Sequence, residues 1–264
     1  MDDQVERLVD KVWNKSLQTP PDRRFMIGIG GIPGSGKTTL SQIVTTELNR
    51  RHAALDPSHP SYTPTPIAAF VPMDGYHLTR AQLSAMPDPA TAHARRGAEF
   101  TFDGPAFLKL IQALREPLPL PVPAPAPAPA PAPSQGTETG AYPPGTILAP
   151  SFDHAVKDPK ENDIPILPSH RIVVFEGNYV ALDKEPWSAA ARLMDEVWFV
   201  DVDFAVARRR LVVRHVKAGI AKDEAEADRR AVENDLPNGE EIVKMRLPVD
   251  EVIESRDDRA WVHE

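Results

Sequence analysis

The chain has no cysteine among its 264 residues, which excludes disulfide bonds, zinc–thiolate sites and thiol nucleophiles. The absence of disulfides also suits a reducing compartment. No apolar run approaches the roughly 18 residues that a membrane-spanning helix needs. Residues 1–15 are acidic where a secretory signal peptide is basic, and they lack its apolar segment. We therefore expect a cytoplasmic protein without a membrane span, and import into an organelle stays open.

Positive charge is also scarce, because 38 acidic residues outnumber 30 lysines and arginines and give a formal net charge of -8. Affinity for nucleic acid polymers rests largely on lysines and arginines that neutralise phosphates, so such a partner is disfavoured. A small phosphorylated ligand needs only a few local cations and remains compatible. The expected partner is a small molecule, and the oligomeric state stays open.

Proline is abundant, with 29 residues, and much of it falls in one Pro/Ala-rich segment over residues 117–140. Such a low-complexity run cannot build a core and is typical of a semi-rigid polyproline II spur. One interpretation is a docking ligand for an aromatic groove. A tolerated surface insertion is favoured, because closing a long loop costs little additional entropy.

Outside that segment, the spacing of apolar residues predicts alternating strands and helices. Val5, Leu8, Val9 and Val12 recur at helical spacing, which indicates an amphipathic helix within residues 1–20. The alternation is typical of a doubly wound parallel sheet with helices on both faces, in a single α/β domain over residues 1–264. The predicted strands are 25–32, 67–78, 171–182 and 196–203, and the further helices are 35–51, 107–115 and 204–217.

The segment GIPGSGKT at 31–38 satisfies the phosphate-loop pattern GxxxxGK[ST] between a predicted strand and a predicted helix. Its glycines let the backbone wrap around phosphate oxygens, and the helix N-terminus adds partial positive charge. Lys37 supplies a full charge to the β- and γ-phosphates, and the Thr38 hydroxyl is placed to ligate Mg²⁺. The sequence therefore predicts a P-loop NTPase that binds ATP and Mg²⁺. The residues predicted to bind ATP are Gly31, Ile32, Pro33, Gly34, Ser35, Gly36, Lys37, Thr38 and Thr39.

Further blocks follow the phosphate loop in a fixed order: VPMDGYHL, ARRGAEFTFD, APSFDHAVKDP, VVFEGNYV and RRRLVVRH. This succession resembles the phosphoribulokinase and uridine kinase group of P-loop kinases, including a fungal and bacterial kinase-like branch, and pantothenate kinase carries similar blocks. The resemblance runs from about Phe25 to Asn238, interrupted by the Pro/Ala-rich segment. It implies a fold similar to that of nucleoside monophosphate kinases, with a helical lid at about residues 204–235.

The resemblance also implies roles for individual residues. Asp74, at the end of the second predicted strand, corresponds to the carboxylate that takes the proton of the acceptor hydroxyl, and it also suits Mg²⁺. Glu176 corresponds to an acidic residue that holds Mg²⁺ together with Thr38. Arg210 and Arg214 lie four residues apart in the lid and would offset the charge of the transferring phosphoryl group, with Lys37 as the fourth catalytic residue.

Other matching positions surround the acceptor in this group and together describe a polar pocket. The same resemblance assigns Asn234–Gly239 to the border of the adenine. The predicted acceptor residues are Tyr76, His77, Arg95, Arg96, Asp103, Asp153, His154, Asn178 and Tyr179.

The sequence thus predicts a kinase that transfers the γ-phosphoryl group of ATP to a hydroxyl of a nucleoside-, sugar- or vitamin-like metabolite. A regulatory or assembly protein that only hydrolyses ATP is the alternative from another class. A kinase-like binding module is disfavoured because Lys37, Thr38, Asp74 and Glu176 are retained, and a guanine-specific switch because no NKxD-type segment occurs. The acceptor blocks match neither uridine kinase nor pantothenate kinase completely, so the acceptor is not carried over from either.

Overall fold

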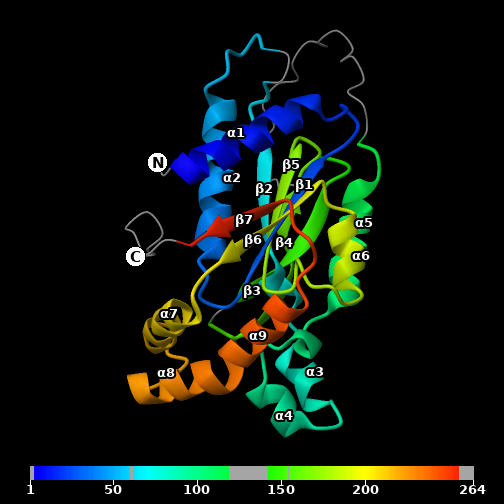
Figure 1. Ribbon diagram of the computed structural model, residues 1–264. Coiled ribbons are helices and arrows are strands. Elements are labelled where there is room, and N and C mark those ends of the chain that lie inside the picture. The colour runs from blue at the N-terminus through cyan, green and yellow to red at the C-terminus, as the bar shows by residue number, and fades with distance from the viewer. Residues whose placement is uncertain (1–2, 60–61, 119–141, 154, 256–264) are drawn as a thin grey trace, which may run out of the picture.

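The computed structural model describes residues 3–59, 62–118, 142–153 and 155–255 (Figure 1). Two sequence-based expectations fall outside these ranges. They are the Pro/Ala-rich spur, except for residues 117–118, and the predicted acceptor residue His154. Within the described residues, no helix has the length and apolar character needed to span a bilayer.

A five-stranded sheet forms the centre of the described chain, in the order β2-β5-β1-β6-β7. Every neighbouring pair is parallel, as the alternating pattern predicts. All residues of β1 and β5 are buried, which explains why these strands read as continuous apolar runs rather than as alternating ones. The strands are β1 (Phe25–Gly31), β2 (Ala68–Pro72), β5 (Ile172–Glu176), β6 (Glu196–Asp201) and β7 (Glu251–Glu254).

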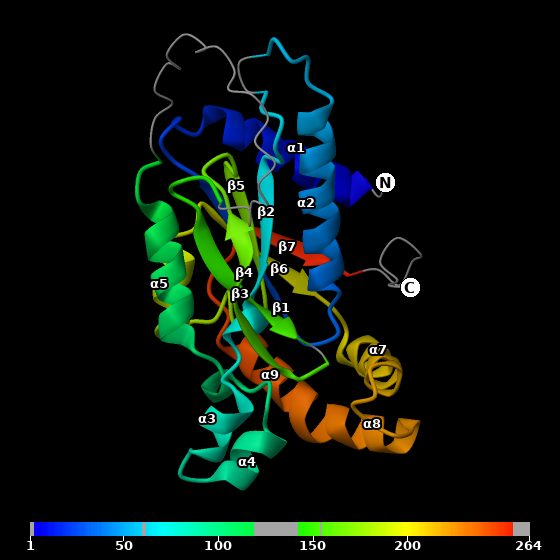
Figure 2. The same cartoon turned by 180° about the vertical axis from the view of Figure 1, so that it is seen from behind.

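Helices cover both faces of this sheet, so the doubly wound α/β prediction is confirmed (Figures 1 and 2). Alternate residues of β1 feed two separate cores: Ile27 packs in the cluster that contains Leu8, and Met26 packs in the cluster that contains Phe107. Helices α1 (Asp3–Gln18) and α2 (Lys37–Ala53) supply the first core, and α5 (Gly104–Arg115) and α6 (Trp187–Arg192) supply the second.

Two predicted strands are too long, and both end where the chain turns at the carboxyl edge of the sheet. β2 stops at Pro72 and continues as the 3-10 helix η1 (Met73–Tyr76), and β5 stops at Glu176. The turns are tightly packed, because a Cβ on Gly177 would lie 2.4 Å from the Cβ of Met73. Sequence periodicity could not find these ends, since apolar residues continue past both of them.

Several short elements were not predicted. Strands β3 (Ile147–Asp153) and β4 (Asp158–Ile166) form an antiparallel hairpin apart from the main sheet. Helices α3 (Arg80–Ser84) and α4 (Pro89–Ala94), which the 3-10 helix η2 (Glu99–Thr101) follows, are too short to give a periodic signal. The start of α3 is fixed instead by a capping box between Thr79 and Gln82.

The predicted basic helix is confirmed as α7 (Phe204–Lys217). It is followed by α8 (Glu224–Arg230), the π-helical turn η3 (Ala231–Asp235) and α9 (Leu236–Lys244). Helices α7, α8 and α9 gather at the same end of the molecule as α3 and α4 (Figure 1). This is the end at which the carboxyl edge of the parallel sheet lies, where α/β proteins place their ligands.

Candidate active site

The phosphate-loop sequence lies between β1 and α2, in the structural context that the motif requires. Gly34 and Gly36 adopt φ angles of 81° and 88°, in the left-handed region that favours glycine. A Cβ on Gly34 would come 2.8 Å from the carbonyl oxygen of Ala207 in α7. The loop therefore needs glycine both for its own turn and for close contact with helix α7.

Lys37, Thr38 and Glu176 form the centre of the site. The Thr38 hydroxyl donates a 3.0 Å hydrogen bond to Glu176 Oε1, and Lys37 Nζ lies 3.9 Å from the same oxygen. Lys37 also donates to the carbonyl of Ile32 at 3.3 Å. Burial raises the pKa of Glu176 well above its ordinary value, against the opposing effect of Lys37, and burial lowers the pKa of Lys37. Burial disfavours the charged form of Glu176, so a further cation placed beside it would stabilise that charged form.

Asp74 lies at the same edge, in η1. Pro72, two residues before Asp74, is the register partner of Glu176 across β2 and β5, so the turn carries Asp74 just beyond Glu176. The Asp74 carboxylate raises the pKa of both Lys37 and Glu176, which places it within electrostatic reach of both. Its side chain is 51% exposed, unlike Glu176 at 7%. The two carboxylates therefore differ in access: Asp74 can meet a ligand in solvent, whereas Glu176 is enclosed.

The donor atoms at this edge fit Mg²⁺, which prefers hard oxygen ligands. Thr38 offers a hydroxyl, and Glu176 and Asp74 offer carboxylates. In the described part of the chain, no group of three or more histidines, aspartates or glutamates could hold a metal ion alone. A magnesium ion here would therefore complete its coordination with nucleotide phosphates and water.

The arginines of α7, which the sequence predicts to belong to a lid, have different partners. Arg210 Nη1 donates to the carbonyl of Gly34 at 3.3 Å and to Ser255 Oγ at 2.8 Å. Arg214 lowers the pKa of both Lys37 and Glu176, so its guanidinium lies within electrostatic reach of the site. Arg208 instead makes two 2.6 Å bonds to Asp228 of α8, at the exposed side of the lid.

A cavity of about 420 Å³ adjoins η1, on the chain that continues from Asp74. Three predicted acceptor residues line it: Tyr76, His77 and Asp103. Glu161 and Lys109 add charge to its wall, and burial together with the carboxylates of Glu161 and Asp103 raises the pKa of Tyr76. The apolar part of the lining comes from α5 and the β-hairpin, including Ala106, Leu110, Ala113, Ile147, Leu148, Pro150 and Pro159.

At the wall of the cavity, the His77 ring packs in tilted contact with two aromatic rings. Its ring centroid lies 4.0 Å from that of Phe102 and 4.9 Å from that of Phe152, and its Nδ1 lies 2.9 Å from the carbonyl of Asp74. The Arg96 guanidinium lies 5.5 Å from the Phe152 ring centroid and 3.2 Å from Asp158. Segments that are distant in the sequence, around residues 77, 96–102 and 152–158, thus meet around the turn that carries Asp74.

Other predicted acceptor residues are occupied by contacts within the protein. Tyr179 is fully buried and its hydroxyl donates to the carbonyl of Gly97 at 2.8 Å. Asp153 accepts hydrogen bonds from two backbone amides of the hairpin turn, at 2.8 and 3.2 Å. Arg95 donates to Asn238 at 2.6 Å. These hydrogen bonds lie within and between the segments around the site. Asn178, directly after Gly177, is half-buried.

The segment Asn234–Gly239, expected to border the adenine, also packs against the loop that carries Arg95 and Arg96, which we name the acceptor-side loop. Asn234 donates to the carbonyl of Arg96 at 3.0 Å, and Asn238 accepts from Arg95. No sequence pattern indicates this contact, because it joins segments about 140 residues apart.

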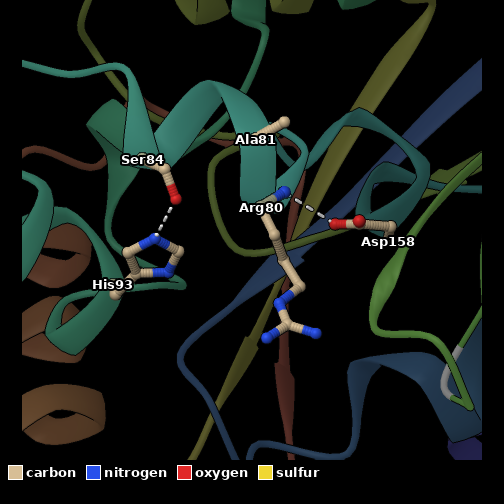
Figure 3. A pocket seen from close by; sticks show the side chains of 5 residues that line it. All are labelled: Arg80, Ala81, Ser84, His93 and Asp158. Atoms are coloured by element: carbon tan, nitrogen blue, oxygen red, sulfur yellow. Dashed lines mark hydrogen bonds between the residues drawn. The ribbon is translucent and has the colours of Figure 1, made fainter.

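Sequence reasoning also missed a second, open cavity of about 550 Å³, formed by α3, α4 and the start of β4. Figure 3 shows its side chains, which include Arg80, Ser84 and His93. Ser84 Oγ lies 2.9 Å from His93 Nε2, and the Arg80 amide donates to Asp158 Oδ1 at 2.8 Å. Its lining residues are Arg80, Ala81, Ser84, His93 and Asp158, so this cavity is separate from the one that adjoins η1.

Comparison with known proteins gives relatives that span the chain, although no family model matches it. The chain is 53% identical over 181 residues to the ATP-dependent kinase-like protein notR' of Aspergillus versicolor, covering 69% of this chain and 92% of that protein. It is 33% identical over 246 residues to a Schizosaccharomyces pombe protein named as a candidate uridine kinase, covering 93% and 89%. It is 33% identical over 199 residues to the ATP-dependent kinase YFH7 of Saccharomyces cerevisiae, covering 73% of this chain and 56% of that one.

Solved structures agree on the fold. The structure of YFH7 from Saccharomyces cerevisiae, described as a candidate P-loop kinase with a circular permutation, matches with a TM-score of 0.74 at 23% identity, covering 97% of this chain and 99% of that one. A kinase ascribed to a fructose transport system of Silicibacter sp. TM1040 matches with a TM-score of 0.67 at 27% identity, covering 92% and 98%. The P-loop kinase architecture therefore extends over nearly the whole chain.

Proposed function

Since the chain belongs to the family of ATP-dependent kinase-like P-loop proteins, we propose that it transfers the γ-phosphoryl group of ATP to a hydroxyl of a nucleoside-, sugar- or vitamin-like metabolite. The observation that carries this proposal is the convergence of Lys37, Glu176 and an exposed Asp74 at one edge of the sheet, next to a cavity of about 420 Å³. That volume is in the range of small-molecule sites, which is roughly 300–1,000 Å³.

In this proposal each residue has a separate task. The amides of the phosphate loop and Lys37 bind the β- and γ-phosphates. Mg²⁺, held by Thr38 and Glu176, would neutralise phosphate charge and orient the oxygens for in-line transfer. Asp74 accepts the proton of the acceptor hydroxyl, which its exposure and its position beside Lys37 support. Arg214 stabilises charge on the transferring group.

The lining of the cavity supports a neutral, hydroxyl-rich acceptor. Asp103 and Glu161 are hydrogen-bond acceptors for hydroxyl groups, and the Tyr76 hydroxyl is a hydrogen-bond donor. The two carboxylates outnumber Lys109 on the same wall and so disfavour an acceptor that carries several negative charges. Nucleosides, sugars and vitamin-like alcohols satisfy both conditions.

The test is ATP consumption and product mass measured across a panel of nucleosides, sugars and vitamin-like alcohols, with Lys37→Ala as the blank. We expect one class of hydroxyl compound to accelerate ATP consumption and to gain one phosphoryl group. ATP consumption that is equal with and without every compound would instead support a protein that only hydrolyses ATP.

A further inference from the structure

One segment contacts the lid, the phosphate loop and the acceptor-side loop together. It comprises the π-helical turn η3 and the start of α9, residues 231–239. π-helical turns are rare and often occur at functional sites, because they change the direction of a side chain within a helix. A Cβ on Gly239 would lie 3.2 Å from the Phe204 ring of α7 and 3.3 Å from Ile32 of the phosphate loop. This segment is therefore packed against both α7 and the phosphate loop.

The π-helical turn directs Asp235 at the lid helix. Asp235 Oδ2 lies 2.9 Å from His215 Nε2 of α7, and the two side chains are 13% and 3% exposed. The other ring nitrogen, His215 Nδ1, is buried without a hydrogen-bond partner among the described residues. Asp235 is thus the polar contact that fixes the orientation of the His215 ring.

The adjacent residue ties the same turn to the acceptor side. Asn234 is 4% exposed and donates to the carbonyl of Arg96 at 3.0 Å. Asn238, one turn later, accepts from Arg95 at 2.6 Å. Both contacts are made by buried asparagines. The acceptor-side loop therefore holds this segment in place together with α7.

An anchor at His215 controls the direction of Arg214. Successive residues of an α-helix are about 100° apart around its axis, so fixing one side chain fixes the rotation of the helix and the direction of the next side chain. Arg214 is the lid arginine that acts electrostatically on both Lys37 and Glu176. Asp235 itself also acts on Lys37, which places its carboxylate near the phosphate loop.

We propose that Asp235 is a positioning residue: through His215 it holds α7 in the rotation that aims Arg214 at the phosphate loop, and through Asn234 the same turn links the lid to the acceptor-side loop. This inference rests on the proposed kinase function for its effect on turnover. Its effect on the lid does not depend on the acceptor.

The experiment compares Asp235→Asn with Asp228→Asn. Both variants replace a carboxylate that bonds α7 by an amide of the same size, but Asp228 pairs with Arg208 on the exposed side of the lid. Amide hydrogen exchange of α7 is measured in the full chain with and without Mg²⁺ and a non-hydrolysable ATP analogue. We expect Asp235→Asn to speed exchange in α7 at least about 5-fold, and Asp228→Asn to change it less than about 2-fold. Equal effects in the two variants, or none in Asp235→Asn, would overturn the proposal.

A second readout separates positioning from general loss of structure. With an active acceptor, turnover of Asp235→Asn should fall about tenfold, while ATP affinity measured by calorimetry stays within about 3-fold or becomes tighter, because a negative charge near the polyphosphate is removed. Parallel loss of turnover and ATP binding would contradict the assignment. If no compound serves as acceptor, the proposed function fails, whereas hydrogen exchange still decides the role of Asp235.

The contact itself is tested by His215→Asn and by the double variant. Residues that act as one unit give non-additive effects, so the double variant should be no more than about 2-fold worse than Asp235→Asn alone. Fully additive losses would show that the two side chains act independently and would overturn the proposed link.

Discussion

At the scale of single residues, the two carboxylates at the edge of the sheet have different environments and therefore different expected roles. Glu176 is enclosed and bonded to Thr38, whereas half of the Asp74 side chain faces solvent. A general base must reach the hydroxyl whose proton it takes, so access favours Asp74. An enclosed carboxylate with hydroxyl and ammonium neighbours is better suited to hold a cation.

We expect Asp74→Asn to reduce phosphoryl transfer by about 10²- to 10⁴-fold, because the amide keeps the shape but cannot take a proton. ATP affinity should fall far less. Lys37→Ala should differ by weakening nucleotide binding itself, since its charge meets the phosphates directly. Single-turnover transfer rates and calorimetric ATP affinities of both variants make the comparison.

Near-normal transfer by Asp74→Asn would show that another group takes the proton. Glu176 and the residues near Asp153 would then be examined, although Asp153 already accepts two backbone hydrogen bonds in the hairpin turn.

At the scale of elements, α7 carries two arginines that share a helix face but have different partners. Arg210 binds the backbone of Gly34, and Arg214 acts on Lys37 and Glu176. We expect Arg214→Ala to lower turnover by up to about 10³-fold with little change in ATP affinity, because its charge matters most as the phosphoryl group leaves. Arg210→Ala should lower turnover and also weaken ATP binding, since it supports the loop. Unchanged turnover in both variants would show that neither arginine takes part in phosphoryl transfer.

A second element, α1, is attached to the sheet by ion pairs whose strength depends on pH. Glu251 of β7 pairs with Arg7 at 2.9 Å and with Lys11 at 2.8 Å, and the Arg7 hydrogen bond chiefly lowers the pKa of Glu251 to about 2. A lowered carboxyl pKa adds stability above the unfolded-state pKa, near 4.5, and this contribution is lost as pH falls toward 2.

We therefore expect Glu251→Gln to lower the free energy of unfolding by about 1 kcal/mol at pH 7, a value kept small because solvent screens these partly exposed pairs. The difference from the unmodified chain should shrink as pH falls below about 4.5. Urea unfolding from pH 7 to pH 3 measures it, with Glu6→Gln on the exposed side of α1 as the control. A difference that does not depend on pH would refute this account of the attachment.

At the scale of the whole molecule, the Pro/Ala-rich segment separates two parts of the chain that share one sheet. Strands on both sides of it pair in one sheet: β1 and β2 precede the segment, β5 and β6 follow it, and β5 lies between β1 and β2. The long connection therefore does not prevent the two halves from folding together.

We expect deletion of Pro119 to Ser134 to change the free energy of unfolding by less than about 1 kcal/mol, because loop-closure entropy grows slowly with length and low-complexity sequence buries little apolar area. ATP affinity should stay the same. Urea unfolding and calorimetry of the deletion variant test both statements. Loss of cooperative unfolding would show that the segment takes part in the core.

The sequence by itself determined the α/β class, the parallel sheet, the phosphate loop and helix α7, because each depends on residues close together in the chain. It also indicated Asp74 and Glu176, which directly follow or end apolar strands. The tertiary structure decided the rest. It enclosed Tyr179 in the core, gave Arg210 and Arg214 different partners, and turned Asn234 toward Arg96. These outcomes depend on contacts between distant segments, which local spacing does not encode. The contact between Asp235 and His215 of α7 has the same origin, because it joins two separate elements.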